Sequence, residues 1–363
     1  MPRQNRSKMR LFLLLGIFCI IPCFFLPILT SEKEKLLLVE NEGRILKSTQ
    51  YSAIFINGND EMEAFPNKTG SGTTEDPYII ENLIINVNGE EDAMALLNID
   101  KPLLVRNCTF SGADSSEFWN QRGSAGLYCF NVENLNISNC VSRLNFYGMF
   151  ITSSVNIAIN SCNISNNFFA IHLYNSFHSI FTANDITNTS YRGFNVYSSD
   201  NNSFYSNNFH SSGGLRFENS DNNYIYSNNA HFNNRGFYIF GSTNNTFVLN
   251  NASNNQYGDI VIQDSRNMTL ERNYGSIQIS GTVLADYSTH DISVTNIAAG
   301  GKPVYYYKDR CGLSVENFTN AGQVILVNCS FSEVSNLNVS GGSTGILLAY
   351  SSNINISGND ASR

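Results

Sequence analysis

Two aspartates occupy equivalent places in the chain and could perform acid–base chemistry together. Asp200 and Asp221 each lie in a Ser-Asp-Asn-Asn tetrapeptide, 21 residues apart. If these positions stack in a repeat, the carboxyl groups lie about 5 Å apart, as in retaining glycosidases. With Arg216 and Glu218 near the same groove, the four residues predict a polysaccharide-cleaving site. The tetrapeptide alone predicts a turn in which each aspartate binds its own backbone.

Three cysteines are candidates for a metal site. Cys108, Cys140 and Cys162 fall in one column of the repeat described below, and stacked thiols suit a soft cation such as Cu(I). Further along the chain the same column holds asparagine, and no cluster of Met or His accompanies the thiols. Small buried fillers are therefore the favoured interpretation, and we expect no resident cofactor.

Aromatic residues recur at two positions of the same repeat and could contact a sugar polymer, whose ring faces are apolar and whose hydroxyl groups are polar. Polar residues, including His172, Arg216 and Glu218, stand among them. The strip is equally typical of ordinary strands, which favour aromatic side chains, and of a surface that binds a protein partner. Its members are Tyr128, Phe130, Phe150, Tyr174, Tyr197, Tyr238 and Phe240.

These residues share a repeat of about 22 residues. Its segments are spaced by 22, 22, 23, 21, 22 and 23 residues, and a period in this range indicates a solenoid or another stacked array. The segments begin at Gly126, Gly148, Ala170, Gly193, Gly214, Gly236 and Asp259, and two more begin at Gly322 and Gly345.

We number positions in each segment from its first residue as offset 0. Offsets 1, 3 and 11 are apolar in nearly every segment, offset 6 is mostly Ser, and offsets 8 and 14 are mostly Asn. Strand-length apolar runs with Asn or Gly at the junctions argue against a helical solenoid. The pattern predicts an all-β, right-handed parallel β-helix over residues 53–363, in which stacked coils form asparagine ladders at offsets 8 and 14. The segment 275–321 breaks the period and predicts a wider coil or a protruding hairpin, and the chain stops in mid-coil.

The pattern Gly-Φ-x-Φ-x-x-Ser-x-Asn-x-x-Φ-x-x-Asn, with Φ apolar, resembles the β-helix repeats of the family named for the periplasmic copper-site maturation protein NosD. The stretches 70–81 and 301–307 resemble the same group. The resemblance covers roughly residues 53–363. The resemblance implies the β-helix fold. It also implies several roles, namely carbohydrate binding, sugar hydrolysis by catalytic carboxylic acids or at a calcium site, and action as an accessory factor for a copper enzyme.

The first thirty residues predict membrane targeting. Arg3, Arg6, Lys8 and Arg10 precede an uncharged stretch at 11–29, and basic flanks remain in the cytoplasm. Residues 1–30 are thus predicted to be a membrane anchor or a cleaved signal, followed by a stalk at 31–52. The remainder is expected outside the cell, either tethered by a single span or secreted.

Composition narrows the function classes. The formal net charge is -8 and only 14% of residues are charged, which argues against binding to nucleic acid. Among the glycosylation sequons, Asn67 and Asn188 occupy expected loops and are the better acceptors.

The leading hypothesis is a non-catalytic surface protein that binds a glycan or a cell-surface protein. The alternatives are a polysaccharide lyase or hydrolase, and a NosD-like accessory factor for a copper enzyme.

Overall fold

The computed structural model describes residues 49–89, 91–115, 123–298 and 300–362, which belong to one compact unit. The predicted anchor (1–30, with the uncharged stretch 11–29) and most of the predicted stalk (31–52) lie outside the described residues. Within the described ranges, no helix is both long enough and apolar enough to span a membrane. Strand β1 (Thr49–Tyr51) pairs with β5 (Leu83–Asn86), so residues 49–51 at the end of the predicted stalk already belong to the first coil.

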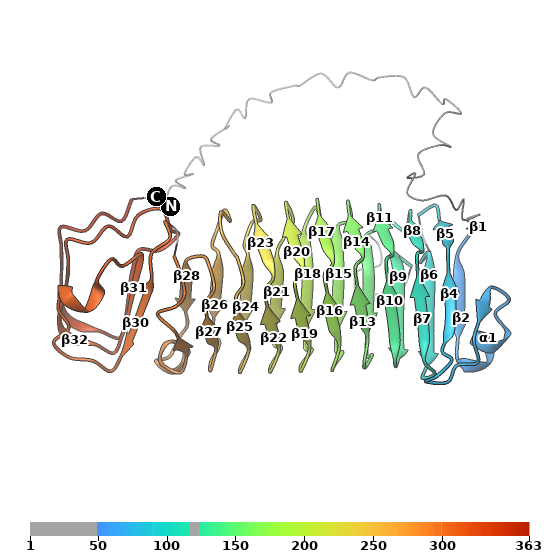
Figure 1. Ribbon diagram of the computed structural model, residues 1–363, viewed down its shortest axis with the longest axis horizontal. Helices are drawn as coiled ribbons and strands as arrows, with labels where there is room; N and C mark the ends of the chain where they lie inside the picture. Colours follow the sequence, from blue (N-terminus) through green and yellow to red (C-terminus); the bar gives the residue numbers. More distant parts are fainter. Residues whose placement is uncertain (1–48, 90, 116–122, 299, 363) are drawn as a thin grey trace, which may run out of the picture. The chain divides into compact units, whose positions relative to one another are not determined.

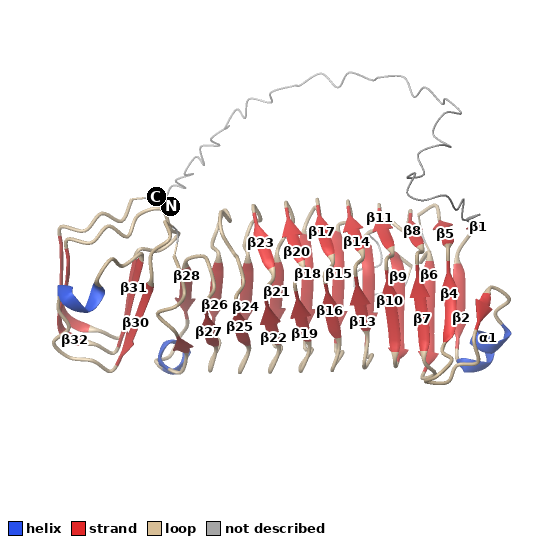
Figure 2. Cartoon of the chain, in the orientation of Figure 1, coloured by secondary structure: helices blue, strands red, loops and turns tan. Residues whose placement is uncertain are grey.

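The described chain is a stack of coils whose strands form three long sheets, which are parallel except where the short strand Lys68–Thr69 pairs antiparallel at the end of one sheet (Figure 1, Figure 2). Sheet 1 contains β2 (Ile54–Asn57), β6 (Met94–Ile99), β9 (Ala125–Val132), β12 (Tyr147–Thr152), β15 (Phe169–Tyr174), β18 (Arg192–Tyr197), β21 (Leu215–Glu218), β24 (Phe237–Phe240), β26 (Ile260–Gln263) and β28 (Ile277–Ser280). Sheet 2 contains β3 (Lys68–Thr69), β4 (Tyr78–Glu81), β7 (Leu103–Arg106), β10 (Leu135–Ser138), β13 (Ala158–Asn160), β16 (Ile180–Thr182), β19 (Ser203–Tyr205), β22 (Tyr224–Tyr226), β25 (Thr246–Val248), β27 (Thr269–Glu271) and β29 (Asp291–Ile292). Sheet 3 contains β1, β5, β8 (Thr109–Ser111), β11 (Val141–Arg143), β14 (Asn163–Ser165), β17 (Asp185–Thr187), β20 (Asn208–His210) and β23 (Asn229–His231).

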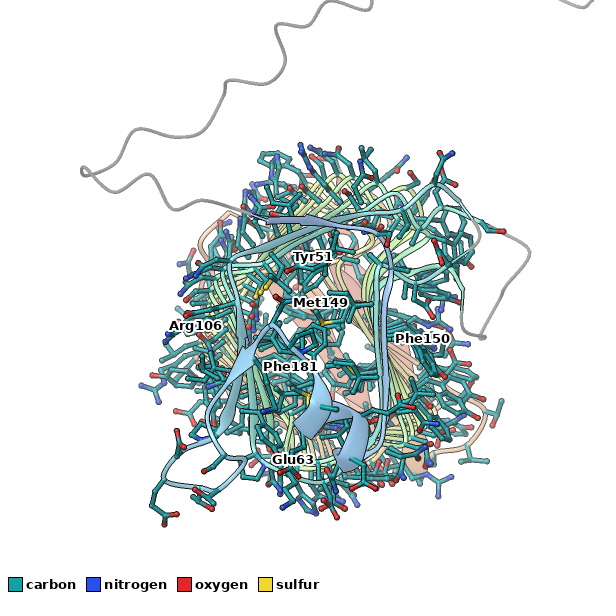
Figure 3. All side chains as sticks on the ribbon, turned by 90° about the vertical axis from the view of Figure 1, so that its right-hand side faces the viewer. Tyr51, Glu63, Arg106, Met149, Phe150 and Phe181 are labelled. Atoms are coloured by element: carbon teal, nitrogen blue, oxygen red, sulfur yellow. The ribbon has the colours of Figure 1, made fainter. Side chains whose placement is uncertain are left out.

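The strand register confirms the predicted repeat. Each strand of sheet 1 pairs with the strand one coil away, so that Leu127 faces Met149 and Phe194 faces Leu215 at offset 1. Offsets 1, 3 and 11 are buried in all seven segments and fill the interior of the coils. Figure 3 shows Met149 and Phe181 pointing inward, whereas Phe150 and Arg106 point outward.

Each regular coil turns at four residues in the left-handed backbone region. From Gly126 to Gly236, these corners fall at offsets 5, 8, 13 and 18. Asparagine tolerates this conformation better than other residues with a side chain. The ladder predicted at offset 8 is therefore not a buried row, and in the described residues only Asn156 and Asn134 join their side-chain amides there, with Asn156 Nδ2 donating to Asn134 Oδ1 at 3.3 Å. Asn134, Asn156 and Asn222 are exposed corner residues with φ near +57°.

The ladder predicted at offset 14 is present inside the stack. Asn184, Asn207, Asn228, Asn250 and Asn273 are each buried, and each donates Nδ2–H to the Oδ1 of the asparagine in the following coil. The Ser column at offset 6 forms a second buried row, since the backbone N–H of each serine binds the hydroxyl of the next. The polar groups of these two interior rows are thus paired from coil to coil.

The period breaks after β28, as the sequence indicated. The described part of the segment 275–321 contains two short helices and the strands β28, β29 and β30, and the coils then resume in a three-stranded and a two-stranded parallel sheet. The elements from this point on are α2 (Ala285–Ser288), β29, β30 (Val304–Lys308), η1 (Val315–Phe318), β31 (Gln323–Val327), β32 (Ser330–Ser335), β33 (Ile346–Ala349) and β34 (Ser352–Ser357). Helix α1 (Asn59–Ala64) follows β2 in the first coil.

Candidate functional site

The aspartates proposed as a carboxylate pair bind backbone groups of the next coil. Oδ1 of Asp200 accepts the N–H of Asp221 at 2.7 Å, and Oδ1 of Asp221 accepts the N–H of Thr243 at 2.6 Å. The expected hydrogen bond of each aspartate to its own backbone is thus replaced by one between coils. Because both carboxylates hold neighbouring turns together, their equivalent positions in successive repeat segments have a structural explanation.

Arg216 and Glu218 lie on β21 and point to the outer face of sheet 1. They form an ion pair, with Glu218 Oε2 at 2.7 Å from Nη2 and 3.1 Å from Nε of the guanidinium. Each side chain is about one-fifth exposed. No hydrogen bond or ion pair within the described ranges joins them to Asp200 or Asp221, so the four residues do not form one constellation.

The predicted aromatic strip divides into a buried end and an exposed end. Tyr128 and Phe150 are buried, which overturns the expectation that the whole strip is exposed. They pack edge to face, and with Phe146, Tyr147 and Phe169 they form a hydrophobic cluster on the outer side of sheet 1. The sequence analysis missed these last three residues, which lie one or two positions before the alternating strand residues.

The exposed end of the strip carries a pair of stacked rings. Tyr174 on β15 and Tyr197 on β18 lie with centroids 5.5 Å apart and planes 15° from parallel. Phe130 and Tyr174 are 38% and 42% exposed, and Tyr197, Tyr238 and Phe240 are half-buried. The outer face thus offers aromatic surface from several successive coils.

A polar network begins beside these rings. The amide Nδ2 of Asn195 lies 3.0 Å from Nδ1 of His172, and Asn195 Oδ1 accepts a hydrogen bond from Arg192 Nη1 at 2.9 Å. Burial, together with the charge of Arg192, lowers the pKa of His172 to about 4. The imidazole is therefore neutral near pH 7, and Nδ1 acts as the acceptor for Asn195.

A cavity of about 300 Å³ opens next to this network on the outer face of sheet 1. Three arginines and three tyrosines line it, with Gly213 between Arg192 and Arg235. A Cβ atom on Gly213 would lie 2.5 Å from the Cα of Arg192, so no side chain fits there. The full lining consists of Tyr191, Arg192, Gly213, Arg216, Asn234, Arg235, Tyr238 and Tyr257.

Tyr238 organises the floor of this cavity. The guanidinium carbons of Arg216 and Arg235 lie 4.6 and 4.5 Å from its ring centroid. Its hydroxyl donates to Oε1 of Gln263 at 2.7 Å, which fixes the ring. The sequence analysis identified Arg216 and Tyr238 but missed Arg192, Arg235 and the other two tyrosines. The only signal for these was their position one or two residues before the first residue of a repeat segment.

The three candidate cysteines stack as predicted in the buried column at offset 14. The thiols of Cys140 and Cys162 point to the carbonyls of Val105 and Ile137, the positions that receive Nδ2–H where the column holds asparagine. Hydrogen bonding with the flanking thiols of Cys108 and Cys162, together with burial, raises the pKa of Cys140 above its usual range. Cysteine thus replaces the ladder amide here, and no group of three or more metal-binding side chains occurs in the described ranges.

The two predicted glycosylation sites are accessible. Asn67 and Asn188 are both exposed, and Asn188 lies at a left-handed corner between coils.

Comparisons with known proteins concern the fold. A family model described as right handed beta helix region matches residues 39–209 and 169–296. The match is to the β-helix in general and does not single out the NosD group. No curated protein matches the chain.

Several solved structures are similar in part. A mutant of the periplasmic alginate epimerase AlgG aligns with TM-score 0.45 and 14% identity, covering 86% of this chain and 85% of that one. The A-module of an Azotobacter vinelandii mannuronan C-5 epimerase aligns with TM-score 0.48 and 12% identity, covering 87% and 88%. A pectate lyase aligns with TM-score 0.44 and 13% identity, covering 69% and 80%. Similarity at this level says nothing about the reaction, if any, of this chain.

Proposed function

The chain belongs to the family of right-handed β-helix proteins, and from this premise we propose that the outer face of sheet 1 binds a polysaccharide without cleaving it. The stacked pair Tyr174 and Tyr197 carries the proposal. Two rings held parallel on neighbouring coils present flat apolar surface, and Phe130, two coils from Tyr174 on the same face, adds a further exposed ring. Amide, carboxylate and guanidinium groups beside the rings can bind sugar hydroxyls.

Binding is favoured over cleavage because each candidate carboxylate already has a partner. Asp200 and Asp221 accept backbone N–H groups, and Glu218 is held by Arg216. A general acid or a nucleophile needs a carboxylate free to reach the glycosidic bond. The proposal places this face outside the cell, with residues 11–29 as its membrane anchor or secretion signal.

The test uses the full-length protein and a panel of soluble polysaccharides. Binding is measured by isothermal titration calorimetry, and each polymer is analysed for shortened or unsaturated products after incubation. A Tyr174→Ala/Tyr197→Ala variant should bind on the order of tenfold more weakly, because the stacking surface is lost. The matched control is Tyr205→Ala/Tyr226→Ala, which removes two half-buried tyrosines from paired positions of sheet 2 and should bind normally.

Two results would count against the proposal. Cleaved products would establish the alternative of a polysaccharide lyase or hydrolase and direct mutagenesis to Glu218 and the two aspartates. Failure to bind any polysaccharide would leave a protein partner as the ligand of this face.

A further inference from the structure

The cavity between Arg192 and Arg235 has a charge opposite to that of the whole protein. Three arginines line it, and Glu218, the ion-pair partner of Arg216, is the one carboxylate that an ion pair brings to it. The complete chain carries a net charge of -8. A local excess of two positive charges on an acidic protein is not explained by composition.

Among the residues that the structure describes, two of the three guanidinium groups have no anionic partner. Arg192 binds the amide oxygen of Asn195 and the hydroxyl of Tyr191, which are both neutral. Arg235 packs on the ring of Tyr238, and its buried Nε has no hydrogen-bond acceptor. A buried donor without an acceptor is energetically unfavourable. An anion in the cavity would remove this cost.

The shape of the cavity fits an acidic sugar better than a small free anion. Arg192 and Arg235 belong to coils that are two apart, so their backbones are separated by about 10 Å. Gly213 opens the space between them, and tyrosine rings form apolar walls on which a sugar ring can pack. The planar fork of arginine N–H groups binds carboxylate or sulfate oxygens in a bidentate manner.

We propose that this cavity is an anion subsite, which selects glycans carrying carboxylate or sulfate groups. The inference rests on the proposed function, since it assigns a substrate class to the same outer face. Arg192 and Arg235 supply the direct contacts with the anion. Glu218 holds Arg216 over Tyr238 and acts as a positioning residue.

The test compares polymers that differ only in charge. The full-length protein is titrated with polygalacturonate and its full methyl ester, and with dextran sulfate and dextran. Binding should require the charged member of a pair, and the pair that responds identifies carboxylate or sulfate as the ligand group. Arg192→Gln and Arg235→Gln should each weaken binding of the charged polymer by about tenfold.

Two further variants separate this subsite from general electrostatic attraction. Arg143→Gln removes the same charge from an exposed position on sheet 3 and should leave affinity unchanged. Arg235→Lys keeps the charge without the fork and should recover only part of the affinity. Thermal unfolding of every variant shows whether a loss of binding reflects a loss of fold.

The outcomes distinguish the inference from the proposed function. Equal binding of charged and neutral polymers, dependent on Tyr174 and Tyr197, would overturn the anion subsite and leave glycan binding intact. Charge-dependent binding that both Gln variants retain would also overturn the subsite. No binding to any of the four polymers would refute both.

Discussion

His290 is a fully buried residue that the fold keeps neutral. Its Nδ1 accepts the backbone N–H of Met268 at 3.3 Å, and its Nε2 donates to the carbonyl of Asp286 at 2.8 Å. Lys308 binds the carbonyl of His290 from β30. Burial is the main reason that the pKa of His290 falls to about 4, with a further contribution from Lys308.

This environment predicts loss of stability on acidification. In the unfolded chain the pKa of histidine is about 6.5, so between pH 6.5 and 4 the unfolded state binds more protons than the folded state. Stability should therefore fall as pH decreases through this window, by on the order of 3 kcal/mol for His290 alone. The pKa of His172 is also lowered, so this residue adds to the loss of stability as the pH decreases.

The measurement is the free energy of unfolding in urea at pH 7, 5.5 and 4. His290→Gln should be less stable at pH 7 but should lose less stability on acidification. His178→Asn, which replaces an exposed histidine with the residue common at that corner, should follow the wild type. Identical slopes in the wild type and His290→Gln would show that this buried imidazole does not drive the pH dependence.

At the scale of elements, the offset-14 ladder uses the full hydrogen-bonding capacity of each amide. In Asn228, Nδ2 donates to the carbonyl of Phe204 and to Asn250 Oδ1, while Oδ1 accepts the N–H and the Nδ2–H of Asn207. The ladder therefore ties three successive coils at every rung. Asn222, on the nearby corner, is exposed and contributes chiefly its tolerance of positive φ.

Two alanine variants should separate these roles. Asn228→Ala leaves buried groups of two neighbouring coils without partners and should cost about 3–5 kcal/mol. Asn222→Ala forces alanine into the left-handed region and should cost only about 1–2 kcal/mol. Urea unfolding of both variants checks the difference, and equal costs would contradict the assignment of Asn228 as a rung of the ladder.

The sequence predicts these elements well where a column has one physical cause. Apolar offsets 1, 3 and 11 could be assigned because burial alone selects them. Asn222 and Asn228 could not be told apart, since corner conformation and buried amide pairing select the same residue.

The sequence analysis identified only part of the cavity lining. Arg216 and Tyr238 alternate within strands, whereas Arg192 and Arg235 lie before the alternation begins, and the gap at Gly213 appears only when coils are stacked.

At the scale of the whole stack, each coil contacts mainly the coils beside it. The sheets pair every strand with its neighbour one coil away, and the register is the same along the repeat. In such arrays stability is approximately a sum over units and interfaces. The number of coils should therefore be adjustable without loss of the fold.

Deletion of one whole coil tests this expectation. Removing residues 148–169 joins Tyr147 to Ala170, which restores the column register because Gly148 and Ala170 are the starts of equivalent segments. The variant should fold, with a slightly smaller dependence of unfolding free energy on urea. Removing residues 148–158 shifts every following column by half a coil and should yield an unfolded or aggregated protein, as judged by circular dichroism and gel filtration. Failure of the whole-coil variant alone would show that the coils are not interchangeable.

The side-chain amides of the asparagine ladder also share one dipole direction along the stack. From Asn184 to Asn273 each side-chain amide donates an Nδ2–H to the Oδ1 of the asparagine in the following coil, and Asn296 is the last acceptor of the row. The dipoles of the peptide groups in a sheet largely cancel. The dipoles of aligned side-chain amides add, as peptide dipoles do along a helix. Each amide also polarises the next, so the row is a series of aligned dipoles whose positive end faces the C-terminal coils. The interior of this β-helix is therefore polar along its axis.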